Sequence, residues 1–79
     1  MSPTVFRYKN YRFFFFSREE SRMHVHISSP GGEAKFWIKP VVALADYSGF
    51  SERQLKDLGR IVEEHAKEIE KVWKKHFSC

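Results

Sequence analysis

Cysteine is nearly absent from the sequence: the one cysteine, Cys79, is the last of 79 residues. A single thiol cannot form an intramolecular disulfide, so we expect a core without disulfide cross-links and a protein of a reducing compartment. Long apolar runs are absent too, since the densest stretch, residues 11–16, is too short to span a bilayer and does not fit a secretory signal. We therefore predict a cytoplasmic protein without membrane contact.

The motifs of common cofactor and catalytic sites are also missing. Gly31 and Gly32 stand alone in a turn and do not form a phosphate-binding loop. There is no Ser/His/Asp or Cys/His arrangement, and no cysteine pair that could anchor zinc. We expect no cofactor. The remaining metal hypothesis is a site shared by the His-x-His strands of two chains.

Aromatic residues, in contrast, are abundant: eight Phe, three Tyr and two Trp. A chain this short buries only about 60% of its unfolded surface, so aromatic mass, self-association or both must supply much of its stability. The net charge of +4 is mild. It permits attraction to nucleic acid or to an acidic partner, but it does not require either.

Turn signals divide the chain into short strands followed by a helix. Lys9-Asn10 fits a tight hairpin because Asn tolerates a positive φ, Pro30-Gly31 marks a second turn, and Pro40 should end or bend a strand. We predict one domain over residues 1–79 of the α+β class, with a small antiparallel meander of three to five strands packed on one long C-terminal amphipathic helix. The expected elements are strands at about 5–8, 11–17, 23–28, 33–39 and 41–46 and a helix at about 52–77.

The helix has the strongest signals. Ser51 and Gln54 have the spacing of a capping box, and apolar residues then recur at three- and four-residue steps. His65 falls on this apolar stripe, where we expect a packed histidine. At 1.5 Å per residue the helix is roughly 37 Å long, so its last turns, with Trp73 and Phe77, are expected to overhang the sheet. Such an overhang favours a homodimer.

His24-Val25-His26 is the most pointed candidate site. Residues two apart in a strand share a face, so both imidazoles should lie together on the outer face while Val25 and Ile27 face the helix. On the neighbouring strand, Lys35 and Trp37 should share the face of the histidines, with Arg22 at its edge. This patch could hold a phosphate, move a proton near neutral pH or bind a metal. The alternative is the ordinary polar face of an antiparallel sheet.

The run Phe13–Phe16 does not alternate with polar residues, so both sides of its strand need cover. One face can pack on the helix, whereas the other needs a covering segment, a partner or stacked bases. Basic residues interleave the run, among them Arg12. Aromatic and basic residues together suit single-stranded nucleic acid. The alternative assigns these phenylalanines to the core and a dimer interface.

These pieces together resemble one known family. They are Tyr11-Arg12-Phe13-Phe14-Phe15-Phe16-Ser17, His24-Val25-His26, Ala34-Lys35-Phe36-Trp37, Gly49-Phe50-Ser51 and a helix that ends near Trp73. In this order, over nearly the whole chain, the sequence resembles the bacterial domain-of-unknown-function family 4160, although members often carry Pro where this chain has Met23. The resemblance implies a small protein of a toxin–antitoxin-type gene pair, with a protein partner and possible contact with RNA or DNA.

The leading hypothesis is a component of a toxin–antitoxin-like pair that engages RNA through the strand face. The expected nucleic-acid contacts are Arg12, Arg22 and Trp37. If the protein cleaves RNA, it would be a metal-independent ribonuclease with His24 and His26 as general acid and base and Lys35 steadying the phosphate.

The alternative hypothesis is a non-enzymatic interaction module without nucleic-acid activity. It would be an antitoxin-like partner binder or a homodimer. Its adhesive surfaces would be the Phe13–Phe16 strand and the Trp73–Phe77 helix end.

Overall fold

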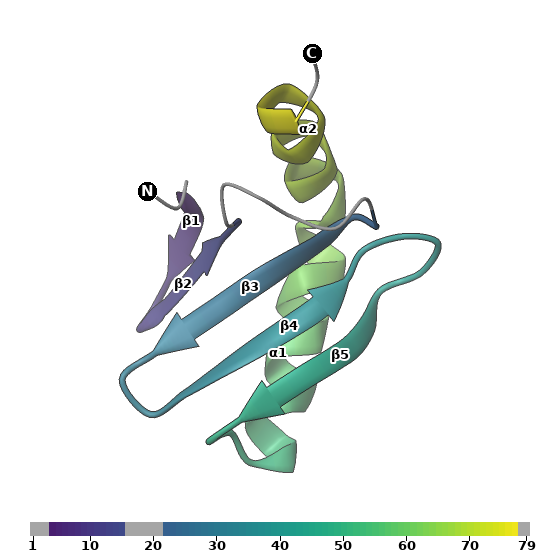
Figure 1. The fold of residues 1–79 in the computed structure, drawn as a ribbon. Coiled ribbons are helices and arrows are strands. Elements are labelled where there is room, and N and C mark those ends of the chain that lie inside the picture. Colours follow the sequence, from purple (N-terminus) through teal and green to yellow (C-terminus); the bar gives the residue numbers. More distant parts are fainter. Residues whose placement is uncertain (1–3, 16–21, 78–79) are drawn as a thin grey trace.

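Each strand of the sheet pairs with the strand that precedes it in the chain, as short connections favour. The computed structural model describes residues 4–15 and 22–77. Its strands are β1 (Thr4–Tyr8), β2 (Tyr11–Phe14), β3 (His24–Ser29), β4 (Gly32–Trp37) and β5 (Ala43–Ser48). They form one antiparallel sheet in the order β1-β2-β3-β4-β5, followed by helices α1 (Glu52–Glu64) and α2 (Ala66–Phe77) (Figure 1). The predicted α+β class and antiparallel meander are confirmed.

Two strand ends lie further from Pro40 than predicted. β4 ends at Trp37 rather than Lys39, and β5 begins at Ala43 rather than Val41. Proline has no backbone N–H to donate to a ladder, so strands rarely run through it. The segment around Pro40 is therefore a loop.

The turn between β1 and β2 is the predicted Lys9-Asn10 hairpin, with Tyr8 opposite Tyr11. However, the positive φ falls on Lys9, at 55°, and not on Asn10 as predicted. The Lys9 ammonium lies 5.5 Å from the centroid of the Tyr8 ring. This cation–π contact accompanies the left-handed conformation of Lys9.

The turn between β3 and β4 is formed by Pro30-Gly31, and it packs closely against the end of β5. Gly49 has a φ of +83°, and a Cβ atom there would overlap the carbonyl oxygen of Gly31. Glycine at position 49 therefore meets two requirements at once, the left-handed backbone and the close approach of two turns.

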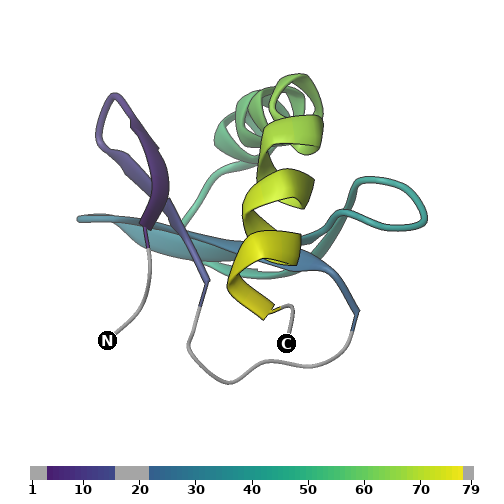
Figure 2. The ribbon, with the colours of Figure 1, turned by 90° about the horizontal axis from the view of Figure 1, so that it is seen from above.

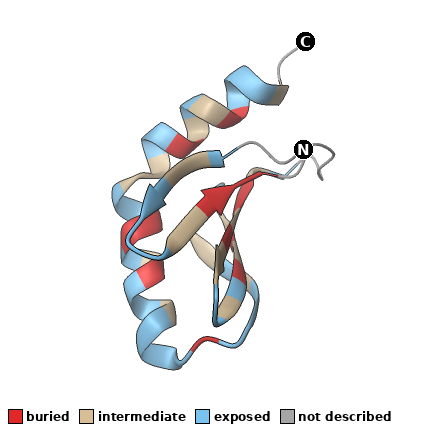
Figure 3. Ribbon diagram, turned by 90° about the vertical axis from the view of Figure 1, so that its left-hand side faces the viewer, coloured by how far each residue is buried: buried red, intermediate tan, exposed pale blue. Residues whose placement is uncertain are grey.

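Side chains that alternate toward the helices form the core. Val25 and Ile27 are at most 1% exposed, which confirms that they face the helices. Figure 3 shows buried residues on the facing sides of the sheet and the helices. The core consists of Phe13, Phe15, Val25, Ile27, Ala34, Phe36, Ile38, Phe50, Leu58, Ile61, Val62, Ile69 and Trp73.

The N-terminus of α1 has the predicted capping box. The backbone N–H of Gln54 donates to the Ser51 hydroxyl at 3.2 Å, and the backbone N–H of Ser51 donates to the Gln54 side-chain oxygen at 2.9 Å. These two bonds satisfy N–H groups that the first turn of a helix leaves without a partner.

The prediction of one long helix is wrong, because the helix breaks at His65. This residue has φ −107° and ψ 11°, outside the helical region, although helical hydrogen bonds run on both sides of it. The His65 ring packs 4.5 Å from the ring of Phe6 on β1, and its Nδ1 lies 3.1 Å from a carboxylate oxygen of Glu68. Figure 2 shows that α2 leaves the direction of α1 at this point.

The end of α2 does extend beyond the strands (Figure 1), but Trp73, which was expected to need another surface, is already covered. Trp73 is only 8% exposed, and its ring lies 5.1 Å from Phe15 and 5.2 Å from His24. Phe77 then packs 4.3 Å from Trp73. Because α2 turns toward the sheet end where β3 begins, the chain itself covers Trp73. A homodimer remains a prediction without this support.

The helices lie on one face of the sheet (Figures 1 and 2), and no described helix or strand covers the opposite face, which we call the outer face. Within the described residues, neither helix is long and apolar enough to cross a membrane.

Candidate functional site

Four rings form a row across β2, β3 and β4 on the outer face. The Phe14 and His26 rings stack with their centroids 5.5 Å apart, and the two histidine rings lie 5.0 Å apart. The ring of Trp37 follows at 5.6 Å from His24. Strand pairing explains the row, since Phe14 lies opposite His26 and His24 lies opposite Trp37. We call these four residues the aromatic row.

Three cationic side chains lie over the two ends of the aromatic row. The guanidinium carbon of Arg12 is 4.6 Å from the Phe14 ring centroid. At the other end, the Lys35 ammonium and the Arg22 guanidinium lie 4.5 and 4.2 Å from the Trp37 ring centroid. Such cation–π contacts hold long side chains over a ring while their charge stays accessible to a ligand.

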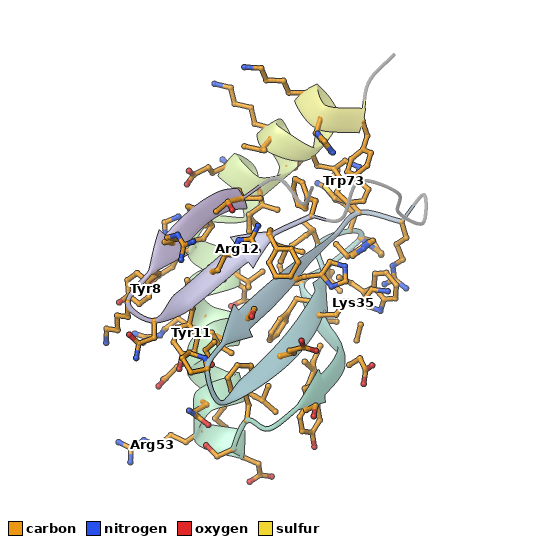
Figure 4. All side chains as sticks on the ribbon, turned by 60° about the vertical axis from the view of Figure 1, so that its left-hand side comes forward. Tyr8, Tyr11, Arg12, Lys35, Arg53 and Trp73 are labelled. Carbon is orange, nitrogen blue, oxygen red and sulfur yellow. The ribbon has the colours of Figure 1, made fainter. Side chains whose placement is uncertain are left out.

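All six residues predicted from the sequence as site residues therefore lie in one region. The predicted hairpin about Pro30-Gly31 brings most of them together, with Lys35 opposite His26. Figure 4 shows Arg12 and Lys35 on the same face of the sheet, whereas Arg53 projects from the far end of α1. The residues are Arg12, Arg22, His24, His26, Lys35 and Trp37.

His24 departs from the prediction that both imidazoles lie on a wet surface. It is fully buried, whereas His26 is half-buried. The cause is tertiary: Trp73 of α2 reaches around the sheet end and packs on the His24 ring. His24 Nδ1 lies 2.7 Å from the carbonyl oxygen of Arg22, and since a carbonyl oxygen can only accept, Nδ1 carries the proton and donates. His24 thus positions its neighbours, and His26 is the histidine that a ligand can reach.

Ion pairs hold α2 beside the His24–Trp37 end of the aromatic row. Glu70 on α2 contacts Lys39 at 3.2 Å and Lys74 at 3.1 Å, and Arg22 Nε donates to the Lys39 carbonyl oxygen at 3.0 Å. Hydrogen bonds from Lys74 and then Lys39 stabilise the carboxylate, so the pKa of Glu70 is lowered from its ordinary value. The network links the loop after β4, and through it Arg22, to the helix that carries Trp73.

Sequence reasoning gave Phe14 no place of its own in the site, because it treated the four phenylalanines as one run. Phe13 and Phe15 are fully buried in the core, whereas Phe14 lies on the side of the sheet that carries His26 and stacks on that ring, which leaves it only 9% exposed. The period of a strand, with Arg12 and Phe14 on one side, was the available signal. Phe16 lies outside the described residues.

A pocket of about 270 Å³ adjoins the aromatic row at its Phe14–His26 end. Two carboxylates, those of Glu33 and Asp46, line it together with the Lys35 side chain. In the sequence these acids are separated and unremarkable, but the pairing of β4 with β5 places Lys35 opposite Asp46 and Glu33 opposite Ser48. The pocket therefore depends on the register between β4 and β5, which could not be predicted from the sequence.

Within the described part of the chain, no group of three or more His, Cys, Asp and Glu side chains is arranged to hold a metal ion.

A family model described as a domain of unknown function, DUF4160, matches residues 10–74. The chain belongs to this family. The matched segment contains β2 to β5, α1 and most of α2, and with them every candidate site residue. Searches of curated proteins and of solved structures find no match. The DUF4160 description names no activity, so the geometry of the outer face is what indicates a function.

Proposed function

We propose that this DUF4160 protein binds single-stranded RNA on the outer face of its sheet, as a component of a toxin–antitoxin-like pair. The observation that carries the proposal is the aromatic row flanked by Arg12, Arg22 and Lys35. Ring faces supply stacking for unpaired bases, and cations beside them supply phosphate contacts.

The spacing of the row suits a strand of RNA that crosses the sheet. Phe14, His26 and Trp37 stand on three neighbouring strands, which lie about 4.8 Å apart. Of these rings, the half-buried His26 and Trp37 have surface left for a base, while the buried Phe14 supports His26. Stacking of one base on an aromatic ring contributes about 1–3 kcal/mol, whichever base it is. A row of rings therefore supports binding that tolerates many sequences.

Burial determines which residues would touch the RNA. His26, Lys35 and Trp37 are half-buried and Arg22 is exposed, so all four are accessible to a ligand. His24 is fully buried, so it would act through His26 and Trp37 rather than on the RNA. If the bound RNA is cleaved, His26 is the candidate acid or base and Lys35 the candidate phosphate contact.

The test is a titration of fluorescently labelled single-stranded RNA, followed by anisotropy. We expect Trp37→Ala to weaken binding by about tenfold, since one stacked base is worth about 1–3 kcal/mol. The matched control is Tyr8→Ala, an aromatic truncation at an exposed ring outside the row. Equal affinities for the wild type and both variants would remove the aromatic row as an RNA-binding surface.

The toxin–antitoxin component of the proposal needs a cellular readout. The protein is induced alone in a bacterial host beside the Lys35→Ala/Trp37→Ala double variant. Growth arrest by the wild type alone, at equal soluble levels, supports a toxin that acts through the outer face. Undiminished growth with both the wild type and the double variant rules against a toxin. The antitoxin role then remains, and co-expression with a neighbouring gene product tests it.

Exposed apolar side chains on β5 and in the loop before it favour a second candidate, a protein-interaction module without RNA binding. Val41, Leu44 and Tyr47 are 66, 40 and 53% exposed, and β5 is an end strand of the sheet. This surface replaces the one expected from the sequence, since Phe15 and Trp73 are buried. Tight association with a protein partner, lost in Leu44→Ser/Tyr47→Ser and accompanied by no RNA affinity, would favour this candidate.

A further inference from the structure

The pocket beside the aromatic row has a chemical character that differs from the row itself. Glu33 and Asp46 supply carboxylate oxygens, Ser48 supplies a hydroxyl, and the Phe14 and His26 rings line the same space together with the Lys35 side chain. Carboxylates repel phosphate but accept hydrogen bonds from N–H groups. Because the two carboxylates outnumber the Lys35 ammonium in this lining, a base suits the interior of the pocket better than a phosphate does.

The volume of the pocket sets the size of that group. Pockets for drug-sized ligands are about 300–1,000 Å³, and this one is slightly smaller, at about 270 Å³. It suits one base. The pocket lies at the Phe14–His26 end of the row, so a base stacked on the half-buried His26 ring can direct its edge toward β5.

Asp46 is positioned to read that edge. Its Oδ1 accepts the backbone N–H of Tyr47 at 2.9 Å, which restrains the carboxylate. The register of β4 and β5 shifts next to this residue, between Lys35 and Phe36, and such irregularities commonly re-aim a side chain at a binding site. The carboxylate therefore has a defined orientation on the outer face.

We propose that this pocket selects guanine in the bound RNA, with Asp46 accepting from the Watson–Crick edge; the inference rests on the proposed function. Guanine alone presents two adjacent donors on that edge, N1–H and the 2-amino group, which match the two oxygens of a carboxylate. Adenine and cytosine present an amino group beside an acceptor nitrogen, and uracil presents one N–H between two carbonyls. In each of these three bases an acceptor would face the carboxylate.

The experiment uses short uridine oligonucleotides that differ in one central base, titrated by anisotropy. We expect the guanosine oligonucleotide to bind about tenfold more tightly than those with adenosine, cytidine or uridine, since a bidentate contact discriminates by that order. Inosine keeps N1–H but lacks the 2-amino group, so it should lose most of the gain. This readout requires no variant and is independent of folding effects.

Two matched variants locate the effect. Asp46→Asn replaces one acceptor by a donor and should abolish the preference for guanosine, whereas Asp57→Asn, on the exposed side of α1, should keep it. Equal affinity for all bases would overturn guanine selection and leave RNA binding intact. The Asp46 carboxylate would then only offset the positive charge of Lys35 on the neighbouring strand. Retention of the preference in Asp46→Asn would also overturn it. Absence of binding to any oligonucleotide would overturn both this inference and the proposed function.

Discussion

At the scale of single residues, the two histidines of one short motif have different physical roles. His24 is packed against Trp37, Trp73 and His26 with no exposed surface, and its Nδ1–H is bonded to a backbone carbonyl. His26 is half-buried on the outer face. A residue of the first kind supports folding, whereas one of the second kind is available to a ligand.

Replacement of the histidines by alanine should therefore have unequal effects on stability. His24→Ala leaves a cavity and a buried carbonyl oxygen without its donor, so we expect it to lower the free energy of unfolding by about 2–4 kcal/mol. For His26→Ala we expect a loss of about 1 kcal/mol or less. Urea unfolding followed by tryptophan fluorescence measures both. Losses of equal size would contradict the assignment of His24 as the structural member of the pair.

Glu70 gives a prediction that depends on pH. Its pKa in the folded protein is lowered from 4.5 by hydrogen bonds from Lys74 and Lys39. A lowered pKa contributes stability that is present above the unfolded value and disappears as the pH falls through the folded value. Glu70→Gln should thus be less stable than the wild type at neutral pH, with the difference vanishing in acid. Urea midpoints across this range, with Glu63→Gln on α1 as control, test it; a constant difference at all pH values would refute the ion-pair explanation.

The residue scale also marks a limit of sequence reasoning. Strand periodicity and a recognisable turn were sufficient to predict that His24, His26, Lys35 and Trp37 adjoin one another. The burial of His24 could not be predicted in this way, because it depends on Trp73, which is distant in the chain and belongs to another element. Local pattern predicts the face of a strand, but not what covers its end.

At the scale of elements, the start of the helix was predictable and its interruption was not. The capping box is a local signal contained in Ser51–Gln54, and the structure has both of its hydrogen bonds. In contrast, the apolar stripe continues through His65 without a Gly or Pro that would end a helix. The break coincides with the packing of His65 against Phe6, a contact from the opposite end of the chain. No local pattern contains that contact.

The capping box itself can be tested as an element-scale feature. Ser51→Ala removes the acceptor for the Gln54 N–H, and we expect a loss of about 1 kcal/mol in the free energy of unfolding. Ser51→Gly should lower the free energy of unfolding by only about a few tenths of a kcal/mol, because glycine lets water reach the N–H groups of the first turn. Urea unfolding of the two variants provides the comparison. If neither variant is less stable than the wild type, the cap contributes little to the stability of α1.

At the scale of the whole molecule, the net charge of +4 was a weak indicator of function, and its distribution is more informative. Arg12, Arg22 and Lys35 come from three separate segments, yet each lies within 5 Å of a ring of the aromatic row. Composition could give the number of charges but not this convergence, which requires the register of the strands. The meander topology was predictable from turns, whereas the pocket at β5 depended on a register shift that no turn signal revealed.

This convergence predicts how RNA binding should depend on salt. Each phosphate neutralised on a single strand contributes about −0.7 to the slope of log affinity against log salt, so three cations should give a slope of about −2. Lys35→Ala should weaken binding and make the slope shallower by about 0.7, because one phosphate contact is lost. Trp37→Ala should weaken binding while leaving most of the slope, because its main contribution is stacking. Anisotropy titrations at several salt concentrations separate the two terms.

The control for this measurement is Arg53→Ala, which removes a cation at the far end of α1 (Figure 4) and should leave both the affinity and the slope unchanged. A slope that falls equally in Lys35→Ala and Arg53→Ala would mean that the RNA responds to overall charge and not to the outer face. A slope near zero in the wild type would mean that bases alone are held, and Arg12, Arg22 and Lys35 would then serve to pack the aromatic row. A wild-type slope of about −2 that only Lys35→Ala reduces would place the phosphates beside the aromatic row, because a contact at any other site would not distinguish Lys35 from Arg53.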